Sequence, residues 1–163
     1  MCLKIIKKTL KLTVLHSLYW FSIQMTLAHF GTKIPNSFFE KNGHIFRIYT
    51  WENNGKFWNR VLKVYQWKHL IPEGSKLNSH IYNKNSIEDL NIETLKQLDI
   101  EMKRAELIHW LSIIPVIIFV KSSRYIQIIN LIYVLFSHIP VILVQRYNRP
   151  RLEKLIRLIY KRG

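Results

Sequence analysis

Glu106 and His109 are the residues whose types and spacing best fit acid–base chemistry. They stand three residues apart in a segment with helical periodicity, so their side chains share one face. A carboxylate beside an imidazole orients the ring and stabilises its charged form, and such an imidazole can act as a general base toward a hydroxyl group. The spacing predicts His109 as the base and Glu106 as its orienting partner. It also fits a helix that carries a last charged residue before it enters lipid, with His109 hydrogen-bonded in the interface.

A second cluster, from Gln145 to Arg151, directly follows an uncharged stretch. Arginines with Asn and Gln can hold a phosphate or carboxylate through two parallel hydrogen bonds. We therefore predict that this cluster and the segment around residue 67 contain substrate-binding residues, namely Arg146, Asn148, Arg149, Arg151, Trp67 and His69. The arginines also fit a positively charged stop signal beside a membrane span. His138, alone in an apolar stretch, is a weaker candidate, because a neighbouring carbonyl group commonly satisfies such a histidine.

Several classes of site are absent from the sequence. It has no G-x-S-x-G, no phosphate-binding Walker loop, no G-x-G-x-x-G, no H-E-x-x-H and no His-x4-Asp box. The single cysteine, Cys2, excludes an intramolecular disulfide and a cysteine-based zinc site. Glu-x-x-His occurs once, whereas di-iron bundles need two copies. We expect neither a metal nor another cofactor.

Charge and hydropathy are strongly segregated along the 163 residues. The formal net charge is +15, and 48% of the residues are apolar. Residues 12–32 and 125–145 contain no Lys, Arg, Asp or Glu, and basic residues adjoin both stretches. About 20 helical residues rise roughly 30 Å, which is enough to cross a bilayer core. Basic clusters beside apolar stretches are typical of membrane anchors rather than nucleic-acid sites, so we predict a lipid membrane as a partner and no nucleic acid.

The fold class predicted is therefore mainly α: an integral membrane protein with two to three apolar helical segments and amphipathic interfacial helices. We expect one membrane-embedded domain over residues 1–163, made of a basic N-terminus (1–11), a first apolar segment (12–32), an interfacial or extramembrane region (33–106), an apolar helical hairpin (107–145) and a basic C-terminal tail (146–163). The first apolar segment resembles a signal peptide with a cleavage site after Ala28, but its apolar run continues to Phe30, which favours a retained anchor.

Local patterns predict individual elements of the region between the apolar segments. Residues 44–51 are β-branched and aromatic, which favours a short strand or an extended segment. The apolar positions from Phe57 to Tyr65 recur at helical spacing among basic residues, which predicts an interfacial helix. Ser86 to Asp89 has capping-box spacing, and a helix is expected from near Asn91 through the apolar stretch to a kink at Pro115.

The two basic ends of the chain limit the number of membrane crossings but do not fix it. Both ends should stay cytoplasmic, which requires an even number of crossings. In one arrangement residues 107–145 cross twice and the first segment is cleaved or interfacial. In the other, the first and last segments cross and residues 107–120 form a short re-entrant or interfacial piece. The sequence leaves both open.

The chain resembles the glycosyl-4,4'-diaponeurosporenoate acyltransferase family over nearly its whole length. Gly31–Pro35 is similar to the family's segment after the first span, and four further segments carry the resemblance, namely Gly55–Asn59, Gln66–His69, Lys103–Trp110 and Gln145–Arg151. The resemblance implies a membrane acyltransferase that esterifies the 6-hydroxyl of a glucose attached to a C30 carotenoid acid with a branched fatty acyl group, the last step of staphyloxanthin synthesis.

The same resemblance implies the cell membrane as location, with the chain integral to it. It also implies a glycosylated carotenoid and a fatty acyl donor as partners, with the donor either acyl-CoA or acyl-carrier protein, and further contact with other enzymes of carotenoid synthesis. The alternative is a non-catalytic membrane subunit that organises those enzymes. The roles of His109 and Glu106 rest on their chemistry and location and are not implied by the resemblance.

Overall fold

The structure is a computed structural model that describes residues 2–71 and 91–161. All regular elements within these residues are helices, so the mainly α prediction is confirmed. The chain divides into two compact units, Met1–Ile34 and Pro35–Gly163. The predicted capping box from Ser86 to Asp89 lies outside the described residues.

The first unit is one long helix, α1 (Cys2–Lys33). It continues without a break through the predicted first apolar segment, because the segment contains no proline and its polar side chains bond within the helix. The Thr13 hydroxyl donates to the Thr9 carbonyl at 3.0 Å, and the Thr32 hydroxyl donates to the His29 carbonyl at 2.8 Å. The apolar segment is therefore helical, as predicted.

The second unit begins with short helices and turns. These are α2 (Asn36–Lys41), the 3-10 helices η1 (Gly43–Phe46) and η2 (Thr50–Glu52), α3 (Lys56–Leu62), α4 (Val64–Trp67) and η3 (Lys68–Leu70). The strand predicted over residues 44–51 is wrong. The Glu52 carboxylate accepts the Tyr49 N–H at 3.0 Å, which closes a turn, and Phe46 packs inward against Phe39 with 5.7 Å between ring centroids. Tertiary burial and a local side-chain acceptor thus override β propensity.

The predicted interfacial helix is present but interrupted. Lys63 has a φ of +50° and separates α3 from α4, so the following Val64 is turned inward and fully buried. Val61, Leu62 and Tyr65 remain exposed.

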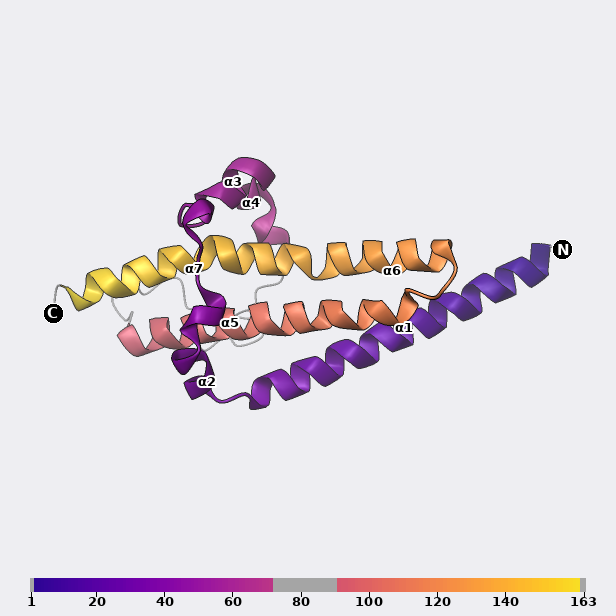
Figure 1. The fold of residues 1–163 in the computed structure, drawn as a ribbon, viewed down its shortest axis with the longest axis horizontal. Coiled ribbons are helices and arrows are strands. Elements are labelled where there is room, and N and C mark those ends of the chain that lie inside the picture. Colours follow the sequence, from indigo (N-terminus) through magenta and orange to yellow (C-terminus); the bar gives the residue numbers. More distant parts are fainter. Residues whose placement is uncertain (1, 72–90, 162–163) are drawn as a thin grey trace. The chain divides into compact units, whose positions relative to one another are not determined.

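Two long antiparallel arms form the body of the second unit (Figure 1). The first arm is α5 (Ile92–Ile113) followed by the 3-10 helix η6 (Ile114–Phe119), and the second is α6 (Arg124–Ser137) followed by α7 (Ile139–Tyr160). The Asn91 side chain accepts the Glu93 N–H at 3.1 Å and caps α5 at the predicted place. Pro115 coincides with the change from α to 3-10 geometry, as the predicted kink requires.

His138 separates α6 from α7, with Pro140 in the first turn of α7. The break is slight, because the His138 N–H still donates to Val134 at 3.0 Å and the His138 carbonyl still accepts from Ile142 at 3.1 Å. Among the described residues, Arg124–Tyr160 is the one helical stretch long and apolar enough to cross a membrane, with a mean hydropathy of 2.0 in its most apolar part. The structure thus supports one such helix, and the predicted count of two to three is not confirmed.

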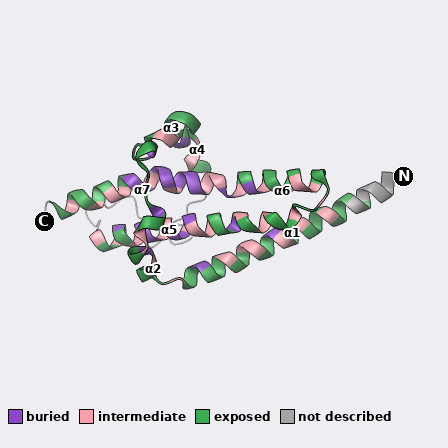
Figure 2. Cartoon of the chain, viewed as in Figure 1, coloured by how far each residue is buried: buried purple, intermediate pink, exposed green. Residues whose placement is uncertain are grey.

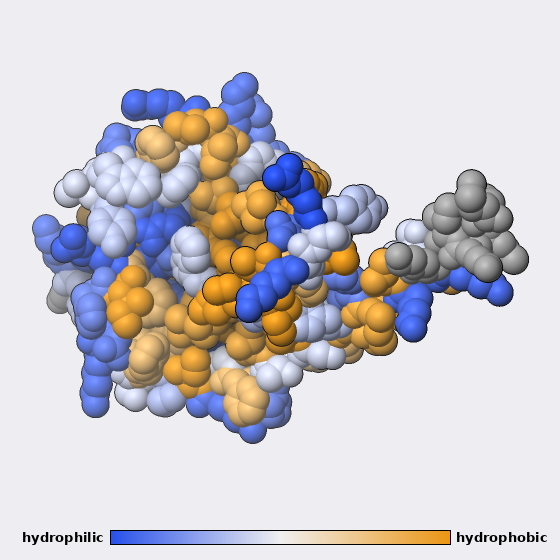
Figure 3. All heavy atoms as spheres, turned by 45° about the vertical axis from the view of Figure 1, so that its right-hand side comes forward, coloured by the Kyte–Doolittle hydropathy of each residue, from blue (hydrophilic) through white to orange (hydrophobic). Residues whose placement is uncertain are grey.

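Burial differs between the two ends of the arms. The middle of α7 is buried (Figure 2). Its Val144 and Tyr147 form a small core with Val64 of α4. The end where the arms join carries exposed apolar side chains, namely Ile114, Ile117, Ile118, Val120, Tyr125, Ile128, Ile129, Leu131, Ile132, Leu135 and Phe136. Hydrophobic residues also form much of the face seen in Figure 3. The second unit therefore has one polar, packed end and one apolar, open end.

Candidate active site

Arg146 of α7 is the centre of a buried ion network. Its Nε donates to Glu52 Oε2 at 2.9 Å, and its Nη2 donates to Glu52 Oε1, so the guanidinium group binds this carboxylate with two parallel bonds. Nη1 donates to Glu106 Oε1 at 2.7 Å, and Nη2 also reaches the Arg47 carbonyl at 3.2 Å. One side chain thus ties α7 to η2 and to α5.

Glu52 is fully buried, and protein groups engage both of its carboxylate oxygens. Besides Arg146, it accepts the Tyr49 N–H and, at 2.7 Å, the indole N–H of Trp58. Burial by itself raises the pKa of Glu52, but the hydrogen bonds from Arg146, Tyr49 and Trp58 outweigh burial and hold the pKa below its ordinary value. Glu52 is therefore an anion of the network at neutral pH.

Arg149 and Glu106 complete the network. Arg149 is fully buried and donates to Glu106 Oε2 and to the Phe46 carbonyl, while its Nε lies 3.5 Å from the Glu153 carboxylate. Glu106, 2% exposed, therefore bridges Arg146 and Arg149. Two cations and two anions are buried together, so their charges balance and their hydrogen bonds offset the cost of desolvation.

In this geometry Glu106, Arg146 and Arg149 have ion-pair partners that the sequence did not indicate. We expected Glu106 to orient His109, but both oxygens of Glu106 accept from arginines. We expected Arg146 and Arg149 to hold a substrate anion, but protein carboxylates already bind their guanidinium groups. Within the network, all three hold the helices together.

His109 has a histidine as its partner. Its Nδ1 lies 3.1 Å from Nδ1 of His138, and the two ring centroids are 5.3 Å apart. This is a hydrogen-bond distance, at which the tautomers of the two rings decide which imidazole donates and which accepts. His138 is 1% exposed, and the ring of Tyr133 meets it edge-on. The histidine pair connects the two arms at the place where the apolar end of the hairpin meets its polar end.

Sequence reasoning ranked His138 low and did not single out Glu52. For His138 a signal was present, because an ionisable side chain within an apolar stretch is commonly functional. For Glu52 the sequence holds no such signal, since 94 residues separate it from Arg146.

The remaining predicted substrate-binding residues lie along α7 and α4. Asn148 Oδ1 accepts from Lys68 at 3.2 Å, and Arg151 stacks on the ring of Tyr147 at 3.7 Å. Trp67 donates its indole N–H to the Leu62 carbonyl at 2.8 Å and packs on the small core. His69 is exposed on η3. Of this set, Arg151 presents an exposed cation.

A metal centre is not apparent in the part of the chain that the structure describes. Residues 2–71 and 91–161 contain no group of three His, Cys, Asp or Glu side chains that could hold a metal ion.

The described residues of the second unit define a class of protein, a helical hairpin with a buried charged network at one end and an exposed apolar surface at the other. The sequence model of the glycosyl-4,4'-diaponeurosporenoate acyltransferase family matches residues 35–158, and the chain belongs to this family.

Curated relatives match over nearly the full length. Proteins named glycosyl-4,4'-diaponeurosporenoate acyltransferase are 45% identical in Staphylococcus aureus strain MRSA252 and 44% identical in strains N315 and USA300. Each alignment covers 99% of this chain and 98% of the relative. No solved structure matches the chain significantly. The chain is thus an acyltransferase, which decides between the enzyme and the non-catalytic subunit in favour of the enzyme.

Proposed function

We propose that this acyltransferase esterifies the glucose 6-hydroxyl of a glycosylated C30 carotenoid acid with a branched fatty acyl group, the last step of staphyloxanthin synthesis. The names of its relatives support the substrate class. The observation that carries the chemistry is the His109–His138 pair, which stands between the buried ion network and the apolar surface of the hairpin. A sugar hydroxyl attached to a lipid-soluble tail meets an acyl chain at such a boundary.

In this proposal His109 is the general base. Its Nδ1–H donates to Nδ1 of His138, which leaves the lone pair on its Nε2 to take the proton of the sugar hydroxyl. The hydroxyl oxygen attacks the acyl carbonyl carbon of a thioester, the new C–O bond forms, and the C–S bond breaks. The departing thiolate takes the proton back from Nε2, so the base is regenerated.

His138 and Glu106 act as positioning residues. His138 accepts from His109 and stabilises its cationic form during the reaction, in the way that a carboxylate does in other catalytic sites. Glu106, one helical turn before His109, acts through Arg146 and Arg149, because this network sets how α5 lies against α7. The orienting role predicted for Glu106 is thus exerted through the helix and not through a direct bond.

We further propose an integral location in the cell membrane, with the apolar end of the hairpin in lipid. The apolar part of Arg124–Tyr160 is only 28% buried, which favours contact with lipid over a place in a protein core. The aromatic helices α3 and α4, with the basic residues of α3, then lie at the headgroup level.

The test is acyl transfer by purified protein in detergent, with glucosylated carotenoid and an acyl donor, and with the ester detected by mass spectrometry. His109→Ala should lower turnover by at least ~10²-fold, the loss typical of removing a general base, while helical content is retained. His138→Ala should lower turnover by a smaller factor and shift the pH profile, because the base loses its acceptor.

His44→Ala is the matched control, because His44 is exposed on η1 and should tolerate the change with activity intact. Wild-type turnover in His109→Ala would overturn the assignment of the base. Absence of any ester product from the wild-type protein with every donor would overturn the proposed reaction.

A further inference from the structure

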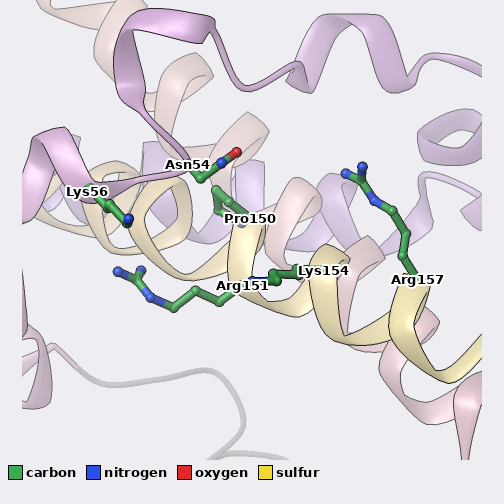
Figure 4. Close-up of a pocket in the computed structure, with 6 residues that line it drawn as sticks. All are labelled: Asn54, Lys56, Pro150, Arg151, Lys154 and Arg157. Atoms are coloured by element: carbon green, nitrogen blue, oxygen red, sulfur yellow. The ribbon is translucent and has the colours of Figure 1, made fainter.

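A strongly basic cavity lies on the polar end of α7, outside the ion network. It has a volume of about 470 Å³. Two segments line it, and the residues are Asn54, Lys56, Pro150, Arg151, Lys154 and Arg157 (Figure 4). Four of these side chains are cationic and none is acidic. In Figure 4 the ends of Lys56 and Arg151 point to the same region of the cavity.

The spacing of the α7 residues explains one wall. Arg151, Lys154 and Arg157 recur every three residues, so they follow one face of the helix. Arg157 lies 3.5 Å from the Glu153 carboxylate, but its side chain is 76% exposed, so this pair neutralises little of its charge.

A strained turn builds the other wall. Asn53, Asn54 and Gly55 all have positive φ, at +48°, +52° and +79°. Positive φ is costly for residues other than glycine and persists only where the surroundings enforce it. Here α7 supplies that support, because Gly55 lies so close to it that a Cβ would stand 2.8 Å from the Tyr147 carbonyl oxygen. The turn thereby brings Asn54 and Lys56 over Pro150 and Arg151.

A membrane stop signal does not account for this arrangement. Such a signal needs only positive charge next to a span, and residues from one segment suffice for it. Here a turn and a helix, almost a hundred residues apart in sequence, place cations around one cavity together with an amide donor. Four cations without a lining carboxylate repel one another, and a polyanion in the cavity would relieve that repulsion.

We propose that this cavity binds the phosphate groups of the acyl donor, and that the donor is a coenzyme A thioester. The assignment rests on the proposed function. Arg151 donates one N–H, from Nη1, to the Tyr147 carbonyl and offers its remaining N–H groups to a phosphate, and the lysines supply further charge-assisted donors. From Arg151 back to His138, α7 rises about 20 Å. An extended pantetheine arm has a comparable length, so it is long enough to reach from the cavity to the histidine pair.

The experiment measures binding of coenzyme A alone to the full chain in neutral detergent by equilibrium dialysis, with no carotenoid present. Lys154→Gln/Arg157→Gln should raise the Kd by at least ~10-fold, because two charge-assisted contacts to phosphate are lost. Both residues are exposed, so helical content and thermal stability should not change. In turnover, the same variant should raise the KM for the acyl donor and leave that for the carotenoid glucoside unchanged.

Lys121→Gln/Arg124→Gln is the matched control. It removes the same two charges at the joint of the two arms, away from the cavity, and should leave the Kd unchanged. Equal Kd values for wild type and the Lys154/Arg157 variant overturn the proposal. Displacement of coenzyme A by phosphatidylglycerol micelles through the same residues also overturns it, in favour of a lipid headgroup site.

Two results separate this inference from the proposed function. Ester formation from acyl-carrier protein, by a chain that does not bind coenzyme A, would overturn the donor site and leave the reaction intact. Binding of coenzyme A that depends on Lys154 and Arg157, without any ester product, would support the site and overturn the proposed reaction.

Discussion

Neutralising Glu106 tests whether the buried network holds the hairpin together. In Glu106→Gln the network keeps both arginines but only Glu52 as a buried anion. Arg149, a fully buried cation, then keeps only the partly exposed Glu153 carboxylate, 3.5 Å from its Nε. Removing one partner of a buried ion pair costs about 3–5 kcal/mol, because the remaining charge stays desolvated without compensation. For a chain of this size, that corresponds to a drop in melting temperature of about 10 °C.

A second substitution restores the balance of charge. Glu106→Gln combined with Arg149→Met leaves one cation, Arg146, with one anion, Glu52, in the buried region. The double variant should therefore be more stable than the sum of the two single effects predicts, with a coupling energy of about 2 kcal/mol or more.

The assay is unfolding of the purified protein in detergent, followed by circular dichroism for the wild type, both single variants and the double variant. Glu93→Gln is the control on the same helix, because Glu93 is exposed in the first turn of α5 and its change should stay within about 0.5 kcal/mol. Activity is recorded in parallel.

Additive effects of the two substitutions would refute the reasoning, since they would mean that Glu106 and Arg149 do not share a buried charge balance. A single Glu106→Gln variant as stable as Glu93→Gln would refute it as well.

Two further predictions concern the turn and its neighbour. Gly55→Ala should destabilise the protein by about 1–3 kcal/mol in thermal unfolding, because φ is +79° and the new Cβ meets the Tyr147 carbonyl oxygen. The control, Gly43→Ala, should change stability little, because no atom lies within 4 Å of its new Cβ. Equal effects of the two substitutions would contradict the close packing of the turn. Because the pKa of Glu52 is lowered, its contribution to stability is present above its ordinary pKa of 4.5 and is lost as pH falls through the lowered value. The melting temperature of Glu52→Gln should therefore lie below that of wild type at neutral pH and approach it in acid. A difference in melting temperature that stays constant with pH would contradict this prediction.

Much of the fold follows from short-range features of the sequence. The cap at Asn91 and the break at Pro115 depend on a side chain or a missing N–H within one helical turn. The uncharged stretch from residue 125 has the length and composition of a membrane helix without reference to other parts of the chain. Such features act between neighbours in sequence, so a pattern of residue types is enough to predict them.

The failed strand marks the limit of this reasoning. Residues 44–51 have the composition of a strand, but a strand also needs a partner, and here the Glu52 carboxylate and the burial of Phe46 stabilise turns instead. The amphipathic helix from Phe57 was likewise interrupted at Lys63, where packing of Val64 on α7 requires a change of direction.

The sequence by itself determined the kind of residues at the site and the face of α5 that carries them. Glu106 and His109 do lie one turn apart on a helix, as their spacing requires. Only the tertiary structure decided their partners, because a shared face does not specify what lies opposite. Arg146 and Arg149 are 40 and 43 residues from Glu106, and His138 is 29 residues from His109. These pairs meet because the two arms of the hairpin are antiparallel. The second arm therefore brings Arg146 and Arg149 to the carboxylate of Glu106, and His138 to the imidazole of His109.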